Sequence, residues 1–335
     1  MEKKSIDRRK REKNVENSMI KIKDKRYRTF NQHLKEFFGE RIYKIGIDAG
    51  FTCPNRNGTK GDTGCIYCYG ERTSTTLLDL PAMREQMRLG MQALVRKYKA
   101  HKFLAYFQSY TNTYAPVEEL ARLYRAALEE PYIVGMSVGT RPDCVSEPVL
   151  DLLGELAQDS YLWLEFGLQS IHDSILTSLH RGHNFDQFLD AYFRARQRRK
   201  IKICVHVILG LPGESNAQML ETAMKLSELA VDGVKIHSAH VVKNTPLANM
   251  YERGEYRPME REEYVNVVCD FLERLSPQII VHRLVADAPR ARFLAPDWCL
   301  QKSQSVSAID EELIRRDSRQ GSQLGAARCK SVPLP

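Results

Sequence analysis

Residues 50–70 read GFTCPNRNGTKGDTGCIYCYG, and they are the most informative stretch of the chain. They place Cys53, Cys65 and Cys68 in a glycine-rich loop with the spacing C-x11-C-x2-C. Three neighbouring thiolates can hold three irons of a 4Fe–4S cluster and leave the fourth iron open, whereas clusters that only transfer electrons normally take four thiolates. An open iron can bind a substrate or a cosubstrate.

A structural zinc site is the alternative use of the same cysteines. Such sites take four protein ligands, often in two C-x2-C-like pairs, and the chain has one tight pair. The other five cysteines are scattered singly, and Cys204, in an apolar run, is most simply a small core residue. The spacing alone favours neither kind of metal centre over the other.

The bulk composition points to a protein of the reducing cytoplasm. The 335 residues can form one large α/β domain or two medium ones. No run of 18 apolar residues is present and the N-terminus is polar, so we expect neither a membrane span nor a signal peptide. Eight unpatterned cysteines are typical of a cytosolic chain. The net charge of +8 favours an anionic partner, nucleic acid first, although many basic enzymes bind none.

Half of the excess charge lies at the N-terminus. Residues 1–24 carry nine Lys and Arg against five acids and almost no apolar residues. We interpret them as a disordered basic arm. An extension without a role, or translation that begins at Met19, is an equally weighted alternative. The small, polar residues 322–335 are also expected to be disordered.

Short β-branched and apolar runs alternate with amphipathic stretches along the chain. The candidate strands are 43–48, 102–108, 132–140, 161–169, 201–209 and 233–242, and the candidate helices are 81–99, 116–130, 147–158, 184–199 and 216–230. This alternation predicts βα units with a parallel sheet, and six units favour an open or closed barrel. No G-x-G-x-x-G follows the first strand, which argues against a dinucleotide-binding fold. A helix over 260–275, a strand over 278–285 and a helix over 305–315 follow.

Polar side chains share one face on several predicted strands. They are Tyr106 with Gln108, Glu165 with Gln169, Lys235 with His237, and His206 by itself. In a βα barrel this face lines the lumen. Burying so many unsatisfied polar groups would cost several kcal/mol, so the pattern predicts a wet, functional lumen. Buried ion pairs, such as Lys235 with Glu165, are the alternative.

Further motifs follow the predicted strands, at the edge where barrel enzymes place their active sites. With them the chain resembles the radical S-adenosylmethionine (SAM) superfamily. Within it, the resemblance is to the bacterial YhcC/YtqA-type, MnmL-like group, related to the radical SAM domain of the Elongator catalytic subunit. It covers about residues 27–321 and rests on RYRTFNQHLKEFFGERIYKIGIDAGFTCPNRNG, GCIYC, QSYTNTYAP, GTRPD, LEFGLQS, HRGHNF, VHVILGLPGE, VKIHSAHVVKNTPLA and AIDEELIRRDSRQG.

The resemblance implies a fold and two cofactors. The fold is a partial (β/α)6 TIM-like barrel over residues 25–259, with a short α/β extension over 260–321 packing on it. Cys53, Cys65 and Cys68 would hold a 4Fe–4S cluster whose open iron chelates SAM. One electron, from a flavodoxin- or ferredoxin-type donor, would then cleave SAM to a 5′-deoxyadenosyl radical that abstracts a hydrogen atom.

The resemblance also implies SAM contacts, residue by residue. They are Tyr67 near the adenine, Gln108 and Ser109 near the methionyl amino group, Gln169 and Arg181 near the ribose and carboxylate, and Gly210 and Leu211 beside the adenine. The chain departs from the superfamily in three places. It lacks glycines at 108–110, it has Gly139 where relatives often have Glu, and its first cysteine spacing is longer than C-x3-C-x2-C. No catalytic residue is assigned.

The resemblance points to tRNA as the substrate. The group is associated with wobble-uridine modification, in which a carboxymethylaminomethyl group becomes aminomethyl. An oxidoreductase acting on a small metabolite or a porphyrin is the alternative. A non-catalytic electron carrier is a third possibility, against which the open iron and the wet lumen argue.

Overall fold

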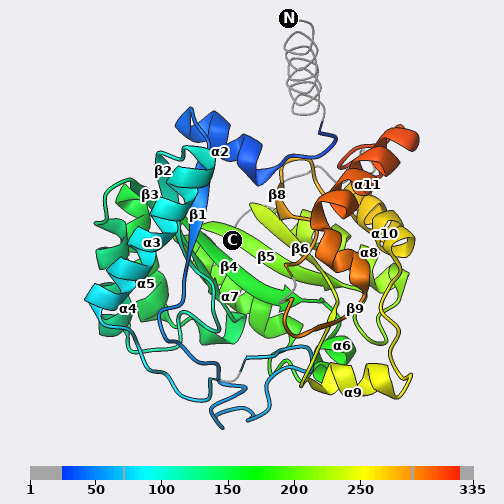
Figure 1. Ribbon diagram of the computed structural model, residues 1–335, viewed down its shortest axis with the longest axis horizontal. Coiled ribbons are helices and arrows are strands. Elements are labelled where there is room, and N and C mark those ends of the chain that lie inside the picture. Colours follow the sequence, from blue (N-terminus) through cyan, green and yellow to red (C-terminus); the bar gives the residue numbers. More distant parts are fainter. Residues whose placement is uncertain (1–24, 71, 288–289, 325–335) are drawn as a thin grey trace, which may run out of the picture.

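The computed structural model describes residues 25–70, 72–287 and 290–324. The expected basic arm, 1–24, and residues 325–335 of the expected tail lie outside them. Seven strands form one curved, wholly parallel sheet (Figure 1). In sheet order they are β1 (Ile42–Ile47), β2 (Lys102–Phe107), β3 (Ile133–Thr140), β4 (Tyr161–Gln169), β5 (Lys202–Leu209), β6 (Gly233–Ser238) and β8 (Ile280–Arg283). The partial barrel predicted from the sequence is therefore confirmed, and the C-terminal extension adds the seventh strand.

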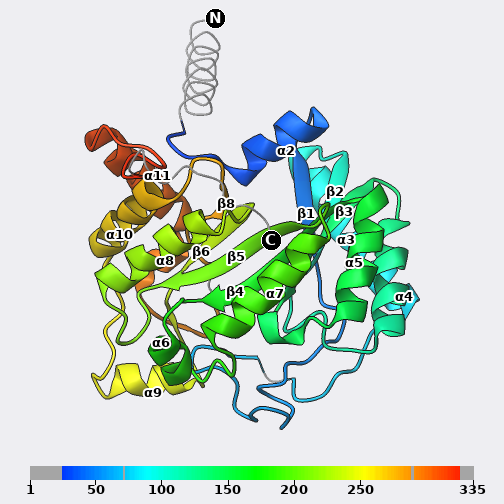
Figure 2. The ribbon, with the colours of Figure 1, turned by 180° about the vertical axis from the view of Figure 1, so that it is seen from behind.

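Helices cover the outer face of the sheet (Figures 1 and 2). They are α3 (Leu80–Tyr98), α4 (Val117–Leu128), α5 (Glu147–Asp159), α7 (Phe185–Gln197), α8 (Asn216–Glu228) and α10 (Arg261–Arg274). Their starts carry clear local signals: the Asp79 side chain caps α3, and Asn184 and Ser215 open α7 and α8 with complete capping boxes. The apolar sides of helices and strands meet in one large core, which leaves the inner face of the sheet for other uses.

The sixth strand is shorter than the sequence pattern predicts. The run 233–242 divides into β6, which ends at Ser238, and β7 (Val241–Val242), which pairs with β9 (Phe293–Ala295) in a separate antiparallel ribbon. The His240 ring contacts the Ser238 carbonyl at 3.1 Å where the chain leaves the main sheet. The run of strand-like residues continues across the turn between β6 and β7, so the sequence periodicity could not show where β6 ends.

A helix that the strand–helix pattern did not predict closes one end of the lumen. The Thr29 side chain caps α2 (Phe30–Phe38), and Gly39, at φ 75°, ends it. Phe30 stacks on His282 with ring centroids 3.9 Å apart, and Thr29 bridges to Val281 beside β8. Figure 1 shows α2 at the end of the sheet opposite the loop that carries the three cysteines.

The remaining helices lie around the edges of the barrel. They are α6 (Asp173–Ser178), α9 (Pro246–Glu252) and α11 (Lys302–Arg315). Residues 321–324 continue onto α10, where Gly321 and Gln323 donate backbone hydrogen bonds to the Leu272 and Glu273 carbonyls. None of the helices in the described ranges combines the length and the apolarity that a membrane crossing needs.

Candidate cofactor and substrate site

The three loop cysteines, Cys53, Cys65 and Cys68, lie between β1 and α3 and are presented by two tight turns. The Cys53 carbonyl accepts hydrogen bonds from two backbone amides, those of Arg56 at 2.8 Å and Asn57 at 3.2 Å. The Cys65 carbonyl accepts one from the Cys68 amide at 2.9 Å. These backbone hydrogen bonds fix the local geometry of the loop, which suits a set of ligands carried on one loop.

A glycine makes the second turn possible. Gly64 has φ 79°, and a Cβ there would lie 2.6 Å from the Arg56 guanidinium. The same guanidinium donates to the Cys68 carbonyl, so Arg56 ties both parts of the loop together. A side chain at position 64 would therefore displace the group that holds the loop closed.

Buried polar contacts anchor the loop to the barrel. The Asn55 amide donates to the carbonyls of His180 at 2.8 Å and Arg181 at 3.0 Å. Arg141, from the GTRPD motif, donates to the Arg181 carbonyl at 2.7 Å and pairs with Asp143 at 2.9 Å. The GTRPD and HRGHNF motifs quoted from the sequence thus have a structural role, because their residues hold the cysteine loop in place.

The charge around Cys65 suits a metal ligand. Its thiol is buried, and Nη1 of Arg181 lies 3.5 Å from Sγ. Burial opposes ionisation, but the Arg181 and Arg141 guanidinium groups hold the pKa of Cys65 below its ordinary value. The thiolate is the form that binds metal. Cys204 differs, because burial raises the pKa of its thiol well above the usual range; it is a core residue, as its sequence context indicated.

The spacing of the loop cysteines does not match a single zinc ion. Two sulfurs that each lie about 2.3 Å from one zinc cannot be more than about 4.6 Å apart. Across the described residues, the side chains whose metal-binding atoms all lie within 4.8 Å of one another are Glu165, Cys204 and His206, and the loop cysteines form no such group. Three free thiols on one loop, with Cys65 beside the buried Arg181 guanidinium, fit a larger cluster.

A pocket of about 370 Å³ opens beside Cys68, at the carboxyl edge of the strands. Four of the seven predicted SAM contacts line it, namely Tyr67, Gln108, Gln169 and Leu211. His206, His237 and His240 also line the pocket, and Nε2 of His237 is buried without a hydrogen-bond partner among the described residues. The pocket therefore contains both expected SAM contacts and a polar atom, His237 Nε2, that is free to bind a ligand.

The other three predicted SAM contacts lie around this pocket. The Ser109 side chain lies beside the Asp48 carboxylate and helps to lower the pKa of that group. Gly210, at φ 85°, stands behind Leu211, where its carbonyl accepts a hydrogen bond from the Tyr256 hydroxyl at 2.8 Å. The Arg181 guanidinium contacts Cys65 and donates to the Gly167 carbonyl at 2.6 Å, with its Nε unpartnered in the described chain. Arg181 thus supports the cysteine loop directly.

Deeper in the lumen, Glu165 gathers three basic side chains. Its carboxylate lies 2.6 Å from Lys44 Nζ, 2.7 Å from His206 Nε2 and 3.0 Å from Lys235 Nζ. Burial opposes the charge, but Lys235 and Lys44 hold the pKa of Glu165 well below its ordinary value. The buried Lys235–Glu165 ion pair that the sequence raised as an alternative is therefore present. It coexists with an open pocket.

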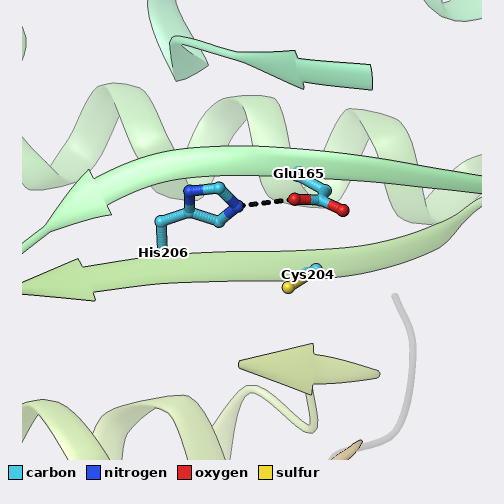
Figure 3. A group of neighbouring side chains, drawn as sticks. All are labelled: Glu165, Cys204 and His206. Atoms are coloured by element: carbon cyan, nitrogen blue, oxygen red, sulfur yellow. Dashed lines mark hydrogen bonds and ion pairs between the residues drawn. The ribbon is translucent and has the colours of Figure 1, made fainter. Parts of the chain in front are cut away.

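Figure 3 shows Glu165 and His206 pointing toward each other from β4 and β5, with Cys204 beside them. The grouping resembles a metal site by distance alone. Two ammonium groups already contact the carboxylate, and the thiol is held protonated by burial. A divalent cation would meet like charges there, so this trio belongs to the ion-pair network.

Sequence reasoning missed two basic residues of the lumen. Lys44 shares a face with Gly46 in the first strand, so period-two alternation could have identified it. Arg283 comes from β8, whose place in the same sheet became evident only from the fold. Both line the interior beside Lys235.

Comparison with known proteins agrees with this geometry. Residues 53–226 match the model of the radical SAM superfamily, and residues 231–315 match that of the radical SAM C-terminal domain. The protein YtqA of Bacillus subtilis is 39% identical over 306 residues, covering 89% of this chain and 92% of YtqA. Protein YhcC of Escherichia coli K12 is 40% identical over 298 residues, covering 88% of this chain and 94% of YhcC.

Similarity extends more weakly to longer proteins. The tRNA uridine(34) acetyltransferase of Methanocaldococcus infernus is 25% identical over 202 residues, which is 59% of this chain and 36% of that enzyme. Among solved structures, the archaeal Methanocaldococcus infernus Elp3 with an N-terminal deletion superposes with a TM-score of 0.61 at 18% identity, covering 83% of this chain and 64% of that one. At that identity the superposition supports the fold alone.

Proposed function

We propose that this chain, which belongs to the radical SAM superfamily, modifies the wobble uridine of tRNA by converting a carboxymethylaminomethyl group to an aminomethyl group. Membership makes it an enzyme that uses a 4Fe–4S cluster and SAM. Bound together, these two groups supply a carbon-centred radical that abstracts a hydrogen atom. The protein's own contribution is binding, orientation and the exclusion of water.

Each part of that contribution falls to identifiable residues. The three loop cysteines are proposed to hold the cluster, with Arg181 lowering the pKa of Cys65. Tyr67, Gln108, Gln169 and Leu211 are proposed to hold SAM, because they wall the pocket that adjoins Cys68. Ser109 and Gly210 are proposed to act indirectly, Ser109 through its neighbour Asp48 and Gly210 through the turn that carries Leu211.

The observation that carries the choice of tRNA is the similarity to a tRNA uridine(34) acetyltransferase over 202 residues of this chain. The match takes up only 36% of that longer enzyme, so the shared part is compatible with the radical SAM barrel and need not include acetyl transfer. The net charge of +8 adds support, since an anionic polynucleotide is attracted by a basic protein.

A redox partner and a compartment follow from this proposal. A flavodoxin- or ferredoxin-type protein would deliver the electron to the cluster, at the face that carries the half-buried Cys53 and Cys68. The reaction would take place in the cytoplasm, where tRNA is modified.

Nucleoside analysis tests the proposal directly. Transfer RNA from a strain that lacks the gene should accumulate carboxymethylaminomethyluridine and lose the aminomethyl product and nucleosides derived from it. A plasmid copy should restore the product, and a copy with Cys65→Ala should not. An unchanged nucleoside profile in the deletion strain would overturn the wobble-uridine proposal.

An oxidoreductase acting on a small metabolite or a porphyrin remains the second candidate, and the limited size of the pocket, about 370 Å³, is what favours it. Salt dependence separates the two. A tRNA enzyme loses substrate affinity steeply between 50 and 200 mM salt, because binding releases condensed counterions. A metabolite enzyme would show a much flatter dependence.

A further inference from the structure

The pocket of about 370 Å³ that the predicted SAM contacts line is called the outer pocket from here on. An inner chamber of about 290 Å³ lies beyond it, toward the end of the lumen that α2 closes. Gln108 and Arg283 line both cavities, so the two adjoin. The chamber is walled by β1, β2, β6, β8 and the Phe30 ring of α2. It uses none of the loop cysteines and only one of the residues expected to contact SAM, Gln108.

The walls of the chamber carry an excess of positive charge. Lys44, Lys235 and Arg283 line it, and none of its described lining residues is a carboxylate. Glu165 lies behind the two lysines and can balance one of them. Arg283 pairs at 2.6 Å with Asp287, which also accepts from Lys302 at 2.7 Å. Three cations therefore line the chamber, and the carboxylates that pair with them, Glu165 and Asp287, are not part of its wall.

The lysines also keep unused hydrogen-bond donors. An ammonium group has three N–H donors. Within the described chain Lys44 makes one hydrogen bond, to Glu165, and Lys235 makes two, to Glu165 and the Tyr106 hydroxyl. Their Nζ atoms lie 4.5 and 4.4 Å from the Tyr106 ring centroid, so both ammonium groups meet at this ring. Together they offer a small anion several donors at one place.

The histidines nearby do not change this balance at neutral pH. Burial is the main cause that lowers the pKa of His206 to about 4 and that of His282 well below its ordinary value. Burial also lowers the pKa of Lys235, but only to about 8. At pH 7 the histidines are therefore neutral and the lysine is mostly charged.

We propose that the inner chamber is a carboxylate-binding subsite, in which Lys44 and Lys235 hold the anionic end of the substrate's side chain. This identification of the substrate group rests on the proposed function, because the carboxymethylaminomethyl group of the wobble uridine ends in a carboxylate. A carboxylate there supplies the negative charge that the chamber lacks, and it accepts from the donors that Glu165 and Tyr106 leave free.

The outer pocket reaches down toward the chamber, because His206 lines that pocket and its Nε2 lies 2.7 Å from the Glu165 carboxylate. Glu165 precedes Gln169 by four residues in β4, so its Cα lies about 13 Å below that of Gln169 at the rim. A carboxymethylaminomethyl chain is much shorter than this, so its carboxylate meets the two lysines when the ring is seated deep in the outer pocket, beside His206. A carboxylate held by the lysines thereby fixes the position of the carbon atoms between the ring and the anion relative to the SAM site.

Binding measurements test the subsite without any turnover. The probes are two anticodon stem-loop RNAs that differ at one group: one carries carboxymethylaminomethyluridine and the other its methyl ester. Full-length protein, reconstituted anaerobically with iron and sulfide and kept without reductant, is titrated against each by fluorescence anisotropy. We expect the free acid to bind about tenfold to a hundredfold more tightly, the range for charge-assisted hydrogen bonds.

Three lysine variants locate the preference. Lys44→Met and Lys235→Met should each lower the ratio of acid to ester affinity toward one. Lys102→Met removes the same charge at the opposite end of β2, where Lys102 pairs with Glu40 at 3.1 Å, and should leave the ratio unchanged. If Lys235→Met does not fold, Lys44→Met decides, because the Lys44 side chain is 21% exposed and less essential to the core.

The outcomes separate this inference from the tRNA proposal. Equal affinity of the wild-type protein for acid and ester overturns the subsite while leaving tRNA as the substrate. A preference that survives in both lysine variants places the carboxylate elsewhere and also overturns it. Failure to bind either RNA sinks the wobble-uridine function itself.

Discussion

Replacing Glu165 with glutamine should strongly destabilise the protein. The substitution keeps the shape of the side chain and removes the charge that Lys44, Lys235 and His206 contact at 2.6–3.0 Å. Glu165 is wholly buried and Lys235 nearly so. Removing one partner of a buried ion pair costs about 3–5 kcal/mol, because the remaining charge has no compensation. That is a large share of the roughly 5–15 kcal/mol that holds a domain together.

Thermal unfolding followed by circular dichroism measures this effect. In a chain of this length one kcal/mol shifts Tm by roughly 2 °C, so Glu165→Gln should lower Tm by about 5–10 °C. Glu155→Gln is the matched control, because it removes a carboxylate from an exposed pair with Arg125 at 2.8 Å. Exposed pairs contribute less than about 1 kcal/mol, so the control should stay close to wild type at the same heating rate.

The pH dependence of the difference identifies its cause. In the wild type, burial lowers the pKa of Lys235 to about 8, below its unfolded value, and Glu165 opposes that shift. As the pH rises through about 8, Lys235 loses its proton in the folded protein and Glu165 no longer has this charge to compensate. The Tm gap between wild type and variant should therefore narrow between pH 7 and 9. A variant that matches the control at pH 7 would refute the reasoning.

Four further predictions concern the site and the charge of the chain. Changing any one of the three loop cysteines to Ala should abolish the uptake of about four irons per chain on anaerobic reconstitution, and Cys204→Ala should not; stoichiometric zinc without iron would contradict this. Arg181→Ala should raise the KM for SAM and lower iron retention, since a charge-assisted contact of about 1.5–3 kcal/mol is lost; unaltered values of both would show that Arg181 supports neither cofactor. Lowering the pH from 7.5 to 5 should destabilise the protein by about 2 kcal/mol for each histidine that behaves like His206. The folded pKa of His206, about 4, lies below the unfolded value near 6.5, so the unfolded state binds the extra proton. Denaturant titrations at a series of pH values check this, and a free energy of unfolding that does not change with pH contradicts it. Removing residues 1–24 should weaken tRNA binding modestly and flatten its salt slope by a few units while turnover at saturating tRNA survives; an unchanged slope would show the arm to be inert.

The parallel barrel could be predicted because its signals are local and repeated. Each unit joins a short apolar run to an amphipathic stretch, and the periods of two and 3.6 residues distinguish them. Alternation also located the inner face, where Glu165 and Lys235 proved to meet. The cysteine loop was recognisable from its spacing as a candidate metal site, because residues on one loop are neighbours in sequence as well as in space.

Features set by distant segments could not be predicted in the same way. Arg283 reaches the lumen only because β8 pairs with β6. The contact of Arg181 with Cys65 depends on the path of a loop 116 residues away, and no periodicity encodes it. The excess of cations over carboxylates in the chamber emerges only when the curved sheet brings β1 and β2 together with β6 and β8, because the sequence does not show that these strands share one cavity.

The closure of the lumen by α2 has a consequence for how the protein is made. The helix leaves the ribosome early, yet its Phe30 stacks on His282 and the adjoining Thr29 bridges to Val281, more than two hundred residues later. Nearby, Gln320 donates to the Arg26 carbonyl at 2.8 Å. At about 5–20 residues per second, β8 follows α2 by some 10–50 s. During synthesis the inner chamber therefore stands open at both ends, and its buried lysines remain in water until the closing helix and the last strand of the sheet are joined.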